Sequence, residues 1–219
     1  MSRRRRLALL LVPIGVFLVL ANTGSVLAPS WAHHHPALLL AFDSRNRHLL
    51  LTVGGGIAPA AFFLIGFARL LITDPLFYLL GRWYGDTAIR WFERTTGGAN
   101  GTAAFISRVF AKAGDALVVI MPNNIVSLLA GHTRMDWRRF AVLDIIGTIG
   151  RLILMWFLGR AFRKPLETVV NWLQRFQWPL IGAFAVIAIL NGLRSARAAV
   201  PVVEELERVA LEEDDQAEA

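Results

Sequence analysis

Charged residues that interrupt apolar stretches are the first candidates for chemistry in this sequence. Asp43, Arg45 and Arg47 lie within residues 36–51, a segment whose two flanks are short and apolar. A charge at the centre of a bilayer costs about 2.5–3.5 kcal/mol on insertion scales, so it requires a partner in protein or water. Guanidinium groups pair with phosphate oxygens in a bidentate manner. The pattern therefore predicts that Arg45 and Arg47 bind a phosphate group, with Asp43 as a neighbouring acid in the same substrate site.

A second interrupted segment and a polar helix stripe supply further candidates. Pro122, Asn123 and Asn124 break the apolar run of residues 115–131, and could offer uncharged donors and backbone groups to a ligand. Asp144 and Arg151 lie seven residues apart and therefore on one face of a helix. This pair is predicted either to bind substrate or to form a structural ion pair. Arg69, near a span end, is expected to reach the membrane surface.

No catalytic, metal or cofactor site is predicted, so we expect a protein that is not an enzyme. The chain has no cysteine, which excludes thiolate catalysis and cysteine-ligated metals. No Ser-His-Asp arrangement, phosphate-binding glycine loop or His-x-x-x-His spacing is present. The adjacent histidines 33–35 are expected in a polar loop, because consecutive side chains rarely converge on one ion.

Composition indicates one membrane domain. Hydrophobic residues make up 55% and charged residues 18%, unlike the roughly 25% charge of soluble domains. The formal charge is +7, although eight acidic residues fall within residues 204–219. No nucleic-acid-binding motif accompanies the basic residues, which flank apolar segments as membrane anchors do. We expect no nucleic acid as a partner.

The apolar blocks predict the elements that must position these residues. Residues 7–28 follow four arginines and are long enough to span a bilayer, although a cleaved signal peptide remains the alternative. Segments 36–51 and 115–131 are too short to span and are predicted to be re-entrant hairpins, with an interfacial amphipathic helix as the alternative for the first. Further spans are predicted over the ranges 49–72, 140–159 and 178–193.

The predicted fold class is an all-α integral membrane protein with about four spanning helices plus two re-entrant hairpins in an inverted repeat. Leu-Gly-Arg follows the predicted span in each half, at residues 80–82 and 158–160. Inverted repeats in transporters place the substrate site near the midplane. The predicted organisation is an N-terminal span (1–29), a core (30–165), a C-terminal span region (166–200) and an acidic cytoplasmic tail (201–219). A break at Asp74-Pro75 and a loop over residues 95–102 are expected within the core.

Two stretches of the core resemble the DedA family, also called the SNARE-associated or VTT-domain family. The first is similar to the family's D-x(2–3)-Y-x-x-G-R-x-x-G element, and the second to its K-x-G…R-F-x-P-x-x-R…A-G-x-x-x-M…F element. The matching residues are Asp74, Tyr78, Gly81, Arg82 and Gly85 in the first element, and Lys112, Gly114, Pro122, Gly131, Arg134, Met135 and Phe140 in the second. Val119 and Ile125 stand where the pattern has two arginines. Members that use those arginines show activity dependent on the proton motive force, so a different mechanism is expected here.

The resemblance covers about residues 30–165 and implies lipid handling: flipping of a polyprenyl-phosphate carrier in bacteria, or phospholipid scrambling in eukaryotic relatives. We therefore expect a multi-pass lipid translocator of the cell inner (plasma) membrane that supports envelope homeostasis. Its expected partners are membrane lipids, an anionic headgroup among them, and a homo-oligomer remains open. The alternatives are a proton-coupled small-solute secondary transporter and a non-transporting assembly factor.

Overall fold

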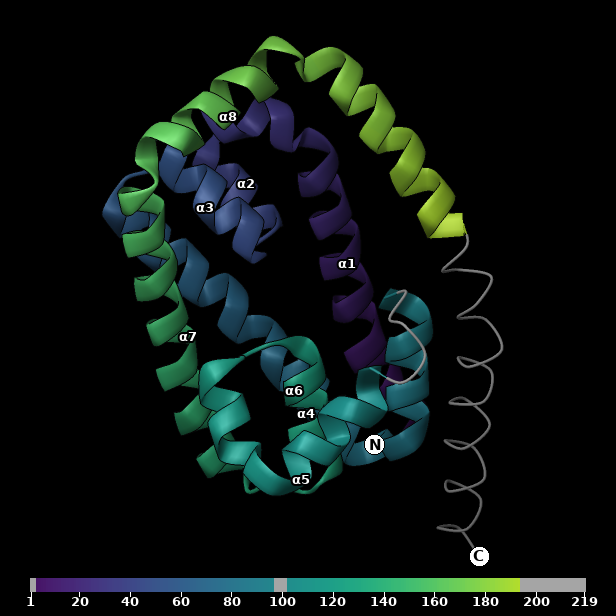
Figure 1. Cartoon of the computed structure of the whole chain (residues 1–219). Helices are drawn as coiled ribbons and strands as arrows, with labels where there is room; N and C mark the ends of the chain where they lie inside the picture. The colour runs from purple at the N-terminus through teal and green to yellow at the C-terminus, as the bar shows by residue number, and fades with distance from the viewer. Residues whose placement is uncertain (1–2, 97–101, 194–219) are drawn as a thin grey trace, which may run out of the picture. The chain divides into compact units, whose positions relative to one another are not determined.

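The computed structural model describes residues 3–96 and 102–193, and those residues form helices joined by short breaks, with no strand among them (Figure 1). In chain order the helices are α1 (Arg3–His34), α2 (Pro36–Phe42), α3 (Asn46–Gly54), α4 (Pro59–Thr96), α5 (Thr102–Ile120), α6 (Asn124–His132), α7 (Trp137–Ala161) and α8 (Arg163–Arg175). The expectation of an all-helical chain is confirmed for this part of the sequence.

Three of these helices have the length and composition of membrane spans. The segments are Leu7–His34 of α1, Pro59–Gly85 of α4 and the whole of α7. Each exceeds the roughly 20 apolar residues that cross a bilayer. A charge-poor helix of that length has satisfied backbone groups and an apolar surface, which is the requirement for insertion into lipid. The chain is therefore a membrane protein by the length and composition of its helices.

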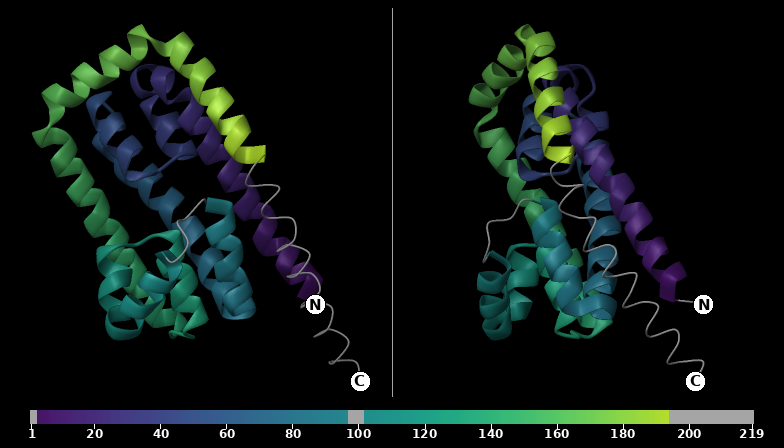
Figure 2. Two further views of the ribbon diagram at one scale, coloured as in Figure 1. Left: turned by 45° about the vertical axis from the view of Figure 1, so that its right-hand side comes forward. Right: turned by 90° about the vertical axis from the view of Figure 1, so that its right-hand side faces the viewer.

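A fourth apolar helix follows α8 after a sharp bend. Gln177–Leu193 meets α8 at 85°. The two helices are long and apolar enough to cross a membrane only when they are counted together. Both views in Figure 2 show this bend at the junction of the two helices. The count of spans is accordingly three, or four when the bent pair is included, against the predicted four.

The chain divides into two compact units, which are described separately. One unit comprises residues 16–72 and 148–190, and holds α2, α3 and α8 with parts of α1, α4 and α7. Its core contains two apolar clusters. One is built on Leu40, Leu49, Val53, Ile57, Phe62 and Leu152, and the other on Ala28, Ala32, Leu39 and Val170. These clusters fix α2 and α3 against neighbouring helices, so the break between α2 and α3 has a defined position.

The other unit comprises residues 1–15, 73–147 and 191–219, and holds α5 and α6 with the remaining parts of the long helices. Its apolar cluster contains Tyr78, Phe110, Val118, Val126, Leu129, Ala130 and Phe140. The rings of Tyr78 and Phe140 stack at 4.6 Å between centroids. Gly81 and Gly131 let α4 and α6 approach closely, because a Cβ at either would collide with a backbone carbonyl of the other helix, that of Leu128 or of Tyr78.

The prediction of a span over residues 49–72 is wrong. The glycine run ends α3 at Gly54, and Gly56 has φ +80°, which glycine adopts without strain. Pro59 then occupies the first position of α4, where its missing N–H costs nothing. The helix that could cross the membrane therefore begins ten residues later than expected, at Pro59.

The expected break at Asp74-Pro75 is also wrong, since α4 continues through Pro75 and departs from helical geometry only at Gly85 (φ 48°, ψ −123°). The histidines 33 and 34 belong to the last turn of α1 instead of a loop. The loop expected over 95–102 has helical residues at both ends, because α4 extends to Thr96 and α5 begins at Thr102. Residues 97–101 lie outside the described part of the chain. The acidic tail 201–219 lies outside it as well.

The close approach of α4 and α6 can be tested with alanine substitutions. Gly81→Ala and Gly131→Ala should each lower stability by about 1–3 kcal/mol, because the added methyl group forces the helix backbones apart. Thermal unfolding in detergent, followed by tryptophan fluorescence, measures the effect. Gly150→Ala in α7 is the matched control, because a Cβ there meets no atom within 4 Å. Equal unfolding temperatures for all three variants would contradict this packing.

Candidate functional site

The polar tip between α2 and α3 holds three of the residues predicted to bind a ligand, Asp43, Arg45 and Arg47. The tip comprises residues 43–48, where α2 ends at Phe42 and α3 begins at Asn46. Asp43 is 1% exposed, and its Oδ1 accepts a hydrogen bond from the backbone N–H of Arg45 at 3.1 Å. This turn, in which an aspartate accepts from the residue two positions ahead, reverses the chain and aims the following side chains.

Three groups contact the other carboxylate oxygen of Asp43. Ser25 of α1 donates its hydroxyl to Oδ2 at 2.9 Å, and Arg47 donates in turn to the oxygen of Ser25 at 2.8 Å. Nδ1 of His48 lies 2.9 Å from the same Oδ2, although its N–H is not directed along that line, so we treat the contact as electrostatic. His48 is itself buried. A buried carboxylate thus lies at the centre of donors from α1 and α3.

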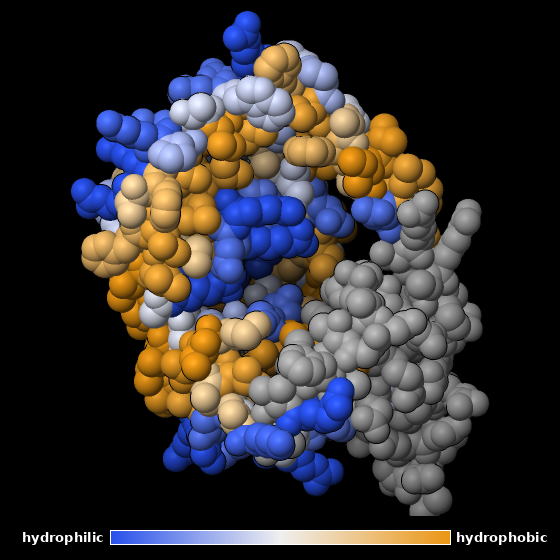
Figure 3. Space-filling view, in the orientation of Figure 1, coloured by the Kyte–Doolittle hydropathy of each residue, from blue (hydrophilic) through white to orange (hydrophobic). Residues whose placement is uncertain are grey.

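Two guanidinium groups share this one carboxylate and remain accessible. Arg45 and Arg47 lie 3.7 and 3.9 Å from the Asp43 oxygens, with side chains 49% and 58% exposed. Figure 3 shows a hydrophilic patch over α3 that is bordered by hydrophobic surface. Positive charge at the tip therefore exceeds the charge of Asp43, and it coincides with the N-terminus of α3, whose helix dipole also favours an anion.

Arg69 of α4 donates hydrogen bonds to the backbone carbonyls at the end of α2. Its Nε donates to the carbonyl of Ala41 at 3.1 Å, and one terminal nitrogen reaches the carbonyls of Phe42 and Phe17 at 3.4 Å. The guanidinium group also lies 4.3 Å from the centre of the Phe17 ring. The last carbonyls of a helix have no partner within it, so a cation there stabilises the end. Arg69 thus has partners within the protein, and its reach to the membrane surface stays a prediction.

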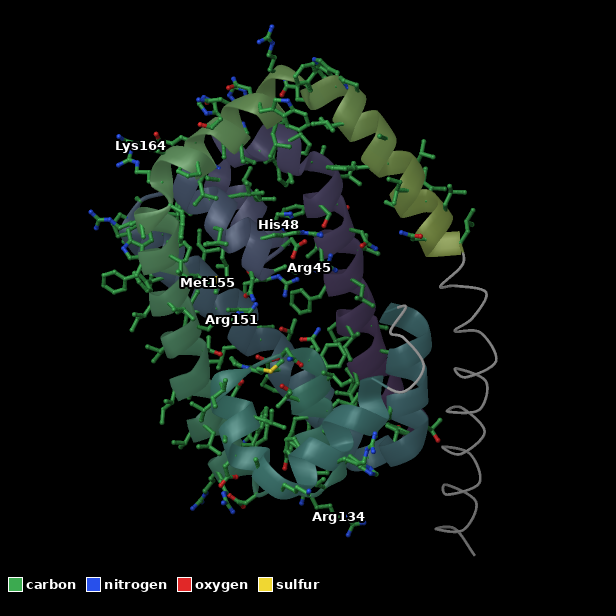
Figure 4. All side chains as sticks on the ribbon, in the orientation of Figure 1. Arg45, His48, Arg134, Arg151, Met155 and Lys164 are labelled. Carbon is green, nitrogen blue, oxygen red and sulfur yellow. The ribbon has the colours of Figure 1, made fainter. Side chains whose placement is uncertain are left out.

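Arg151 of α7 binds the start of α3. Its Nε donates to the side-chain oxygen of Asn46 at 2.8 Å, and its Nη2 lies 3.5 Å from the carbonyl of Ser44. Arg45, His48 and Arg151 gather in one region of Figure 4. Arg151 thus contacts two residues of the short segment that also holds Asp43, Arg45 and Arg47.

Asp43 is ionised at neutral pH. Burial acts to raise the pKa of this carboxyl above its ordinary 3.8, because desolvation disfavours the charged form. The adjacent imidazole of His48, the charge of Arg45 and the N–H of Arg45 act in the opposite direction, and the net pKa is lowered. The carboxylate therefore holds the tip together over the physiological pH range.

The remaining predicted residues belong to the other unit. Pro122 is buried in the break between α5 and α6, and Asn123 caps α6 by accepting from the N–H groups of Ile125 and Val126 at 3.0 Å each. Asn124 is the first residue of α6. The side-chain oxygen of Asn123 thus has a structural role, as an asparagine at an N-cap commonly does.

Asp144 forms a pair with Asp74 instead of Arg151. The two residues are 1% and 3% exposed, and their carboxyl groups interact with each other. The sequence spacing on α7 did not reveal this pair, because Asp74 lies on another helix.

The motif residues of both DedA-like stretches lie in the same unit, and most of them have structural roles there. Tyr78 donates to the carbonyl of Met135, and Arg82 donates to the Tyr78 hydroxyl at 3.0 Å. Gly81 and Gly131 lie at the helix crossing, and Gly85 provides the change of direction in α4. Arg134 has φ 56° just after α6, where its N–H bonds to Gly131, and its side chain is exposed. Figure 4 shows Arg134 pointing away from the protein.

Ser25, Asn46, His48 and Arg69 interact with the tip or with the end of α2, and the sequence analysis did not name them as ligand-binding candidates. Arg69 carried a usable signal, since an arginine in an apolar segment requires a partner. His48 directly follows the charged run and could have been included on that ground. Ser25 and Asn46 carried no signal, because uncharged polar residues are common in such segments.

The tip predicts how stability depends on pH. Because the pKa of Asp43 is lowered by folding, its contribution is complete above about pH 4 and is lost as the pH falls through the lowered value. Asp43→Asn should reduce stability at pH 7 by about 1–3 kcal/mol and flatten the loss of stability below pH 4. Thermal unfolding between pH 3 and 7 measures both effects.

Glu167→Gln is the control for this substitution. Glu167 forms an exposed pair with Arg163 four residues earlier in α8, and such pairs contribute only about 0.3–0.5 kcal/mol. A variant Asp43→Asn that unfolds like Glu167→Gln at pH 7 would contradict the central role of the carboxylate.

The described residues contain no group of three or more His, Cys, Asp or Glu side chains that could hold a metal ion. Comparison with known proteins adds no assignment. No protein-family model, no curated protein and no solved structure matches this chain.

Proposed function

We propose that this chain is a membrane lipid translocator that binds an anionic headgroup at the tip between α2 and α3. The observation that carries the proposal is the pair of accessible guanidinium groups, Arg45 and Arg47, that share the single carboxylate of Asp43. An arginine in apolar surroundings is stabilised by a phosphate, which it can pair with through two hydrogen bonds. A phospholipid or a polyprenyl-phosphate carrier provides such a group.

We further propose that α2–α3 and α5–α6 are re-entrant hairpins of an inverted repeat. With seven and nine residues, α2 and α3 extend over only about 10–14 Å, against a hydrocarbon core of about 30 Å. Non-helical backbone at membrane depth is tolerated where it is buried in protein or lines a wet cavity. The hydrogen bonds from Arg69 and Arg151 to the tip support such an environment.

The resemblance of the core to the DedA family supports the same function, and it also supports our proposal that the protein lies in the cell inner (plasma) membrane with several spans. Translocation requires no bond to be made or broken, which agrees with the proposal that the chain is not an enzyme. In this scheme the headgroup follows a polar path while the acyl or prenyl chains stay in lipid. The tip would bind the phosphate on that path.

The proposed tip can be tested by lipid translocation in liposomes. Arg45→Ala and Arg47→Ala should each weaken binding of an anionic lipid about tenfold to a hundredfold, since one charge-assisted contact contributes about 1.5–3 kcal/mol. Arg→Lys at either position should restore only part of the activity, because the charge returns without the bidentate geometry. Fluorescent phospholipids and dithionite quenching report translocation.

Arg138→Ala is the matched control, because Arg138 is an exposed arginine at the start of α7. Equal translocation rates for Arg45→Ala, Arg47→Ala and this control, at equal protein content, would exclude the tip as the headgroup site.

One observation favours a second function, a proton-coupled secondary transporter for a small solute. The carboxyl groups of Asp74 and Asp144 are buried and interact with each other on two helices that could cross the membrane. Carboxyl groups of this kind form proton relays in pumps and transporters. Under this alternative, transport would respond to a pH gradient through the carboxyl pair.

A pH gradient distinguishes the two functions. For a translocator without proton coupling, phospholipid translocation should be equal with and without the gradient, and Asp144→Asn should leave that equality intact. Asp136→Asn is the control, because Asp136 is exposed. A rate that rises with the gradient in the wild type and in Asp136→Asn, but not in Asp144→Asn, would favour proton coupling.

A further inference from the structure

Helix α8 has three distinct faces. One face packs on the protein: Val170 is 1% exposed, and a Cβ at Gly54 of α3 would lie 2.8 Å from the Cβ of Leu166. A second face is polar and carries, among others, Lys164, Asn171 and Arg175. A third face is apolar and exposed, and its members recur at spacings of three, four or seven residues: Phe162, Val169, Trp172 and Phe176.

The exposed apolar face has nothing covering it within the described residues. Its four side chains are 42–57% exposed. They form one stripe along the helix, because residues three, four or seven positions apart lie at similar angles around the helix axis. A soluble protein would bury such a stripe, since each large apolar side chain gains about 1.5–3 kcal/mol when it leaves water. The occupant of this face must therefore be apolar.

Chain connectivity indicates what that occupant is. The span α7 ends at Ala161, and the next apolar helix, Gln177–Leu193, begins just after α8 and turns by 85°. A helix that follows a span and meets the next apolar helix at 85° has the geometry of a segment that runs along a membrane surface. Thirteen residues give α8 a length of about 20 Å. With a polar face toward water, this helix has the pattern of those that lie in the bilayer interface.

The basic side chains of α8 indicate which class of lipid this helix contacts. Within α8, Arg163 is paired with Glu167 at 2.6 Å, while Lys164 and Arg175 carry exposed charges at opposite ends of the helix. Basic residues at an anionic membrane surface contribute about 1 kcal/mol each, which is about fivefold in lipid affinity. Trp172 and Trp178 are 53% and 77% exposed, and tryptophan favours the headgroup level.

We propose that α8 is an interfacial anchor whose stripe Phe162, Val169, Trp172 and Phe176 inserts among lipid chains, while Lys164 and Arg175 bind anionic headgroups. This surface is separate from the tip between α2 and α3, and the proposal stands whether or not the chain translocates lipid. Since α8 packs on α3, the anchor also fixes the depth at which α3 lies in the membrane.

Site-directed labelling of the full chain in phosphatidylcholine–phosphatidylglycerol vesicles tests the first half of this proposal. The sequence has no cysteine, so single substitutions need no background removal. Nitroxide labels at Val169→Cys and Trp172→Cys should be relaxed by oxygen and shielded from a water-soluble nickel chelate. Labels at Lys164→Cys and Asn171→Cys should show the reverse.

Two outcomes would overturn the insertion of the stripe. Equal access of nickel to all four labels would place α8 in water. Shielding of residues 169 and 172 from both reagents would mean that protein covers the stripe, as in contact with a second copy of this chain. Neither outcome depends on translocation, so failure here is separate from failure of the proposed function.

Shallow doxyl-labelled lipids test the second half. A bimane on Trp172→Cys should be quenched more strongly by doxyl-phosphatidylglycerol than by doxyl-phosphatidylcholine at equal mole fraction. Lys164→Gln and Arg175→Gln should each lower this preference about fivefold, and added salt should lower it in the unsubstituted helix. Arg138→Gln is the control for loss of a charge elsewhere. A preference unchanged by Lys164→Gln and Arg175→Gln would overturn the binding of anionic headgroups.

Discussion

The ends of two short helices must have their backbone groups satisfied away from bulk water, and the tip residues are arranged around that requirement. The carbonyls that end α2 accept from Arg69, the carbonyl of Ser44 faces Arg151, and the turn N–H of Arg45 bonds to Asp43. A buried polar group without a partner costs several kcal/mol in an apolar medium. Cations that satisfy carbonyls bring positive charge with them, which is the property that an anionic ligand requires.

The same requirement links separate helices to the tip. Ser25 from α1, Arg69 from α4 and Arg151 from α7 each provide one hydrogen-bonding side chain, while α8 contacts α3 through Leu166. A substitution at any of these positions therefore acts on the tip from outside its own sequence. Arg45 and Arg47 differ from the rest, because their side chains are largely exposed and their hydrogen-bonding capacity exceeds what one carboxylate and one serine can accept.

The sequence predicted the features that depend on the length and charge of apolar segments. It failed at helix ends that depend on the backbone geometry of a single residue. The chain breaks near Asp43 and Pro122 were predicted because the apolar runs beside them are too short to span a bilayer, and helices end at both places. That these segments are re-entrant stays a prediction. The second span was misplaced, because hydropathy continues across Gly54 to Pro59 while a positive φ at Gly56 ends the helix. Pro75 was predicted to interrupt the helix, but α4 continues through it. Tertiary packing around Tyr78 outweighs the one hydrogen bond that proline cannot make.

At the candidate site, the charged residues were predictable and their partners were not. Asp43, Arg45 and Arg47 form one local turn, so their proximity follows from the sequence. Arg69 and Arg151 reach the tip from distant helices, and one chain without related sequences contains no signal of such pairing. Asp144 was expected to act with Arg151 from their spacing on α7, whereas its partner Asp74 lies 70 residues earlier.

The hydrogen bond between Arg151 and Asn46 joins residues 105 positions apart, and this separation has a consequence for biogenesis. Ribosomes add about 5–20 residues per second, so about 5–20 s pass between synthesis of Asn46 and synthesis of Arg151. During that interval the turn at residues 43–48 lacks one of the helices that complete its hydrogen bonds. Until α7 is made, the side chain of Asn46 and the carbonyl of Ser44 must bond to water or to other groups.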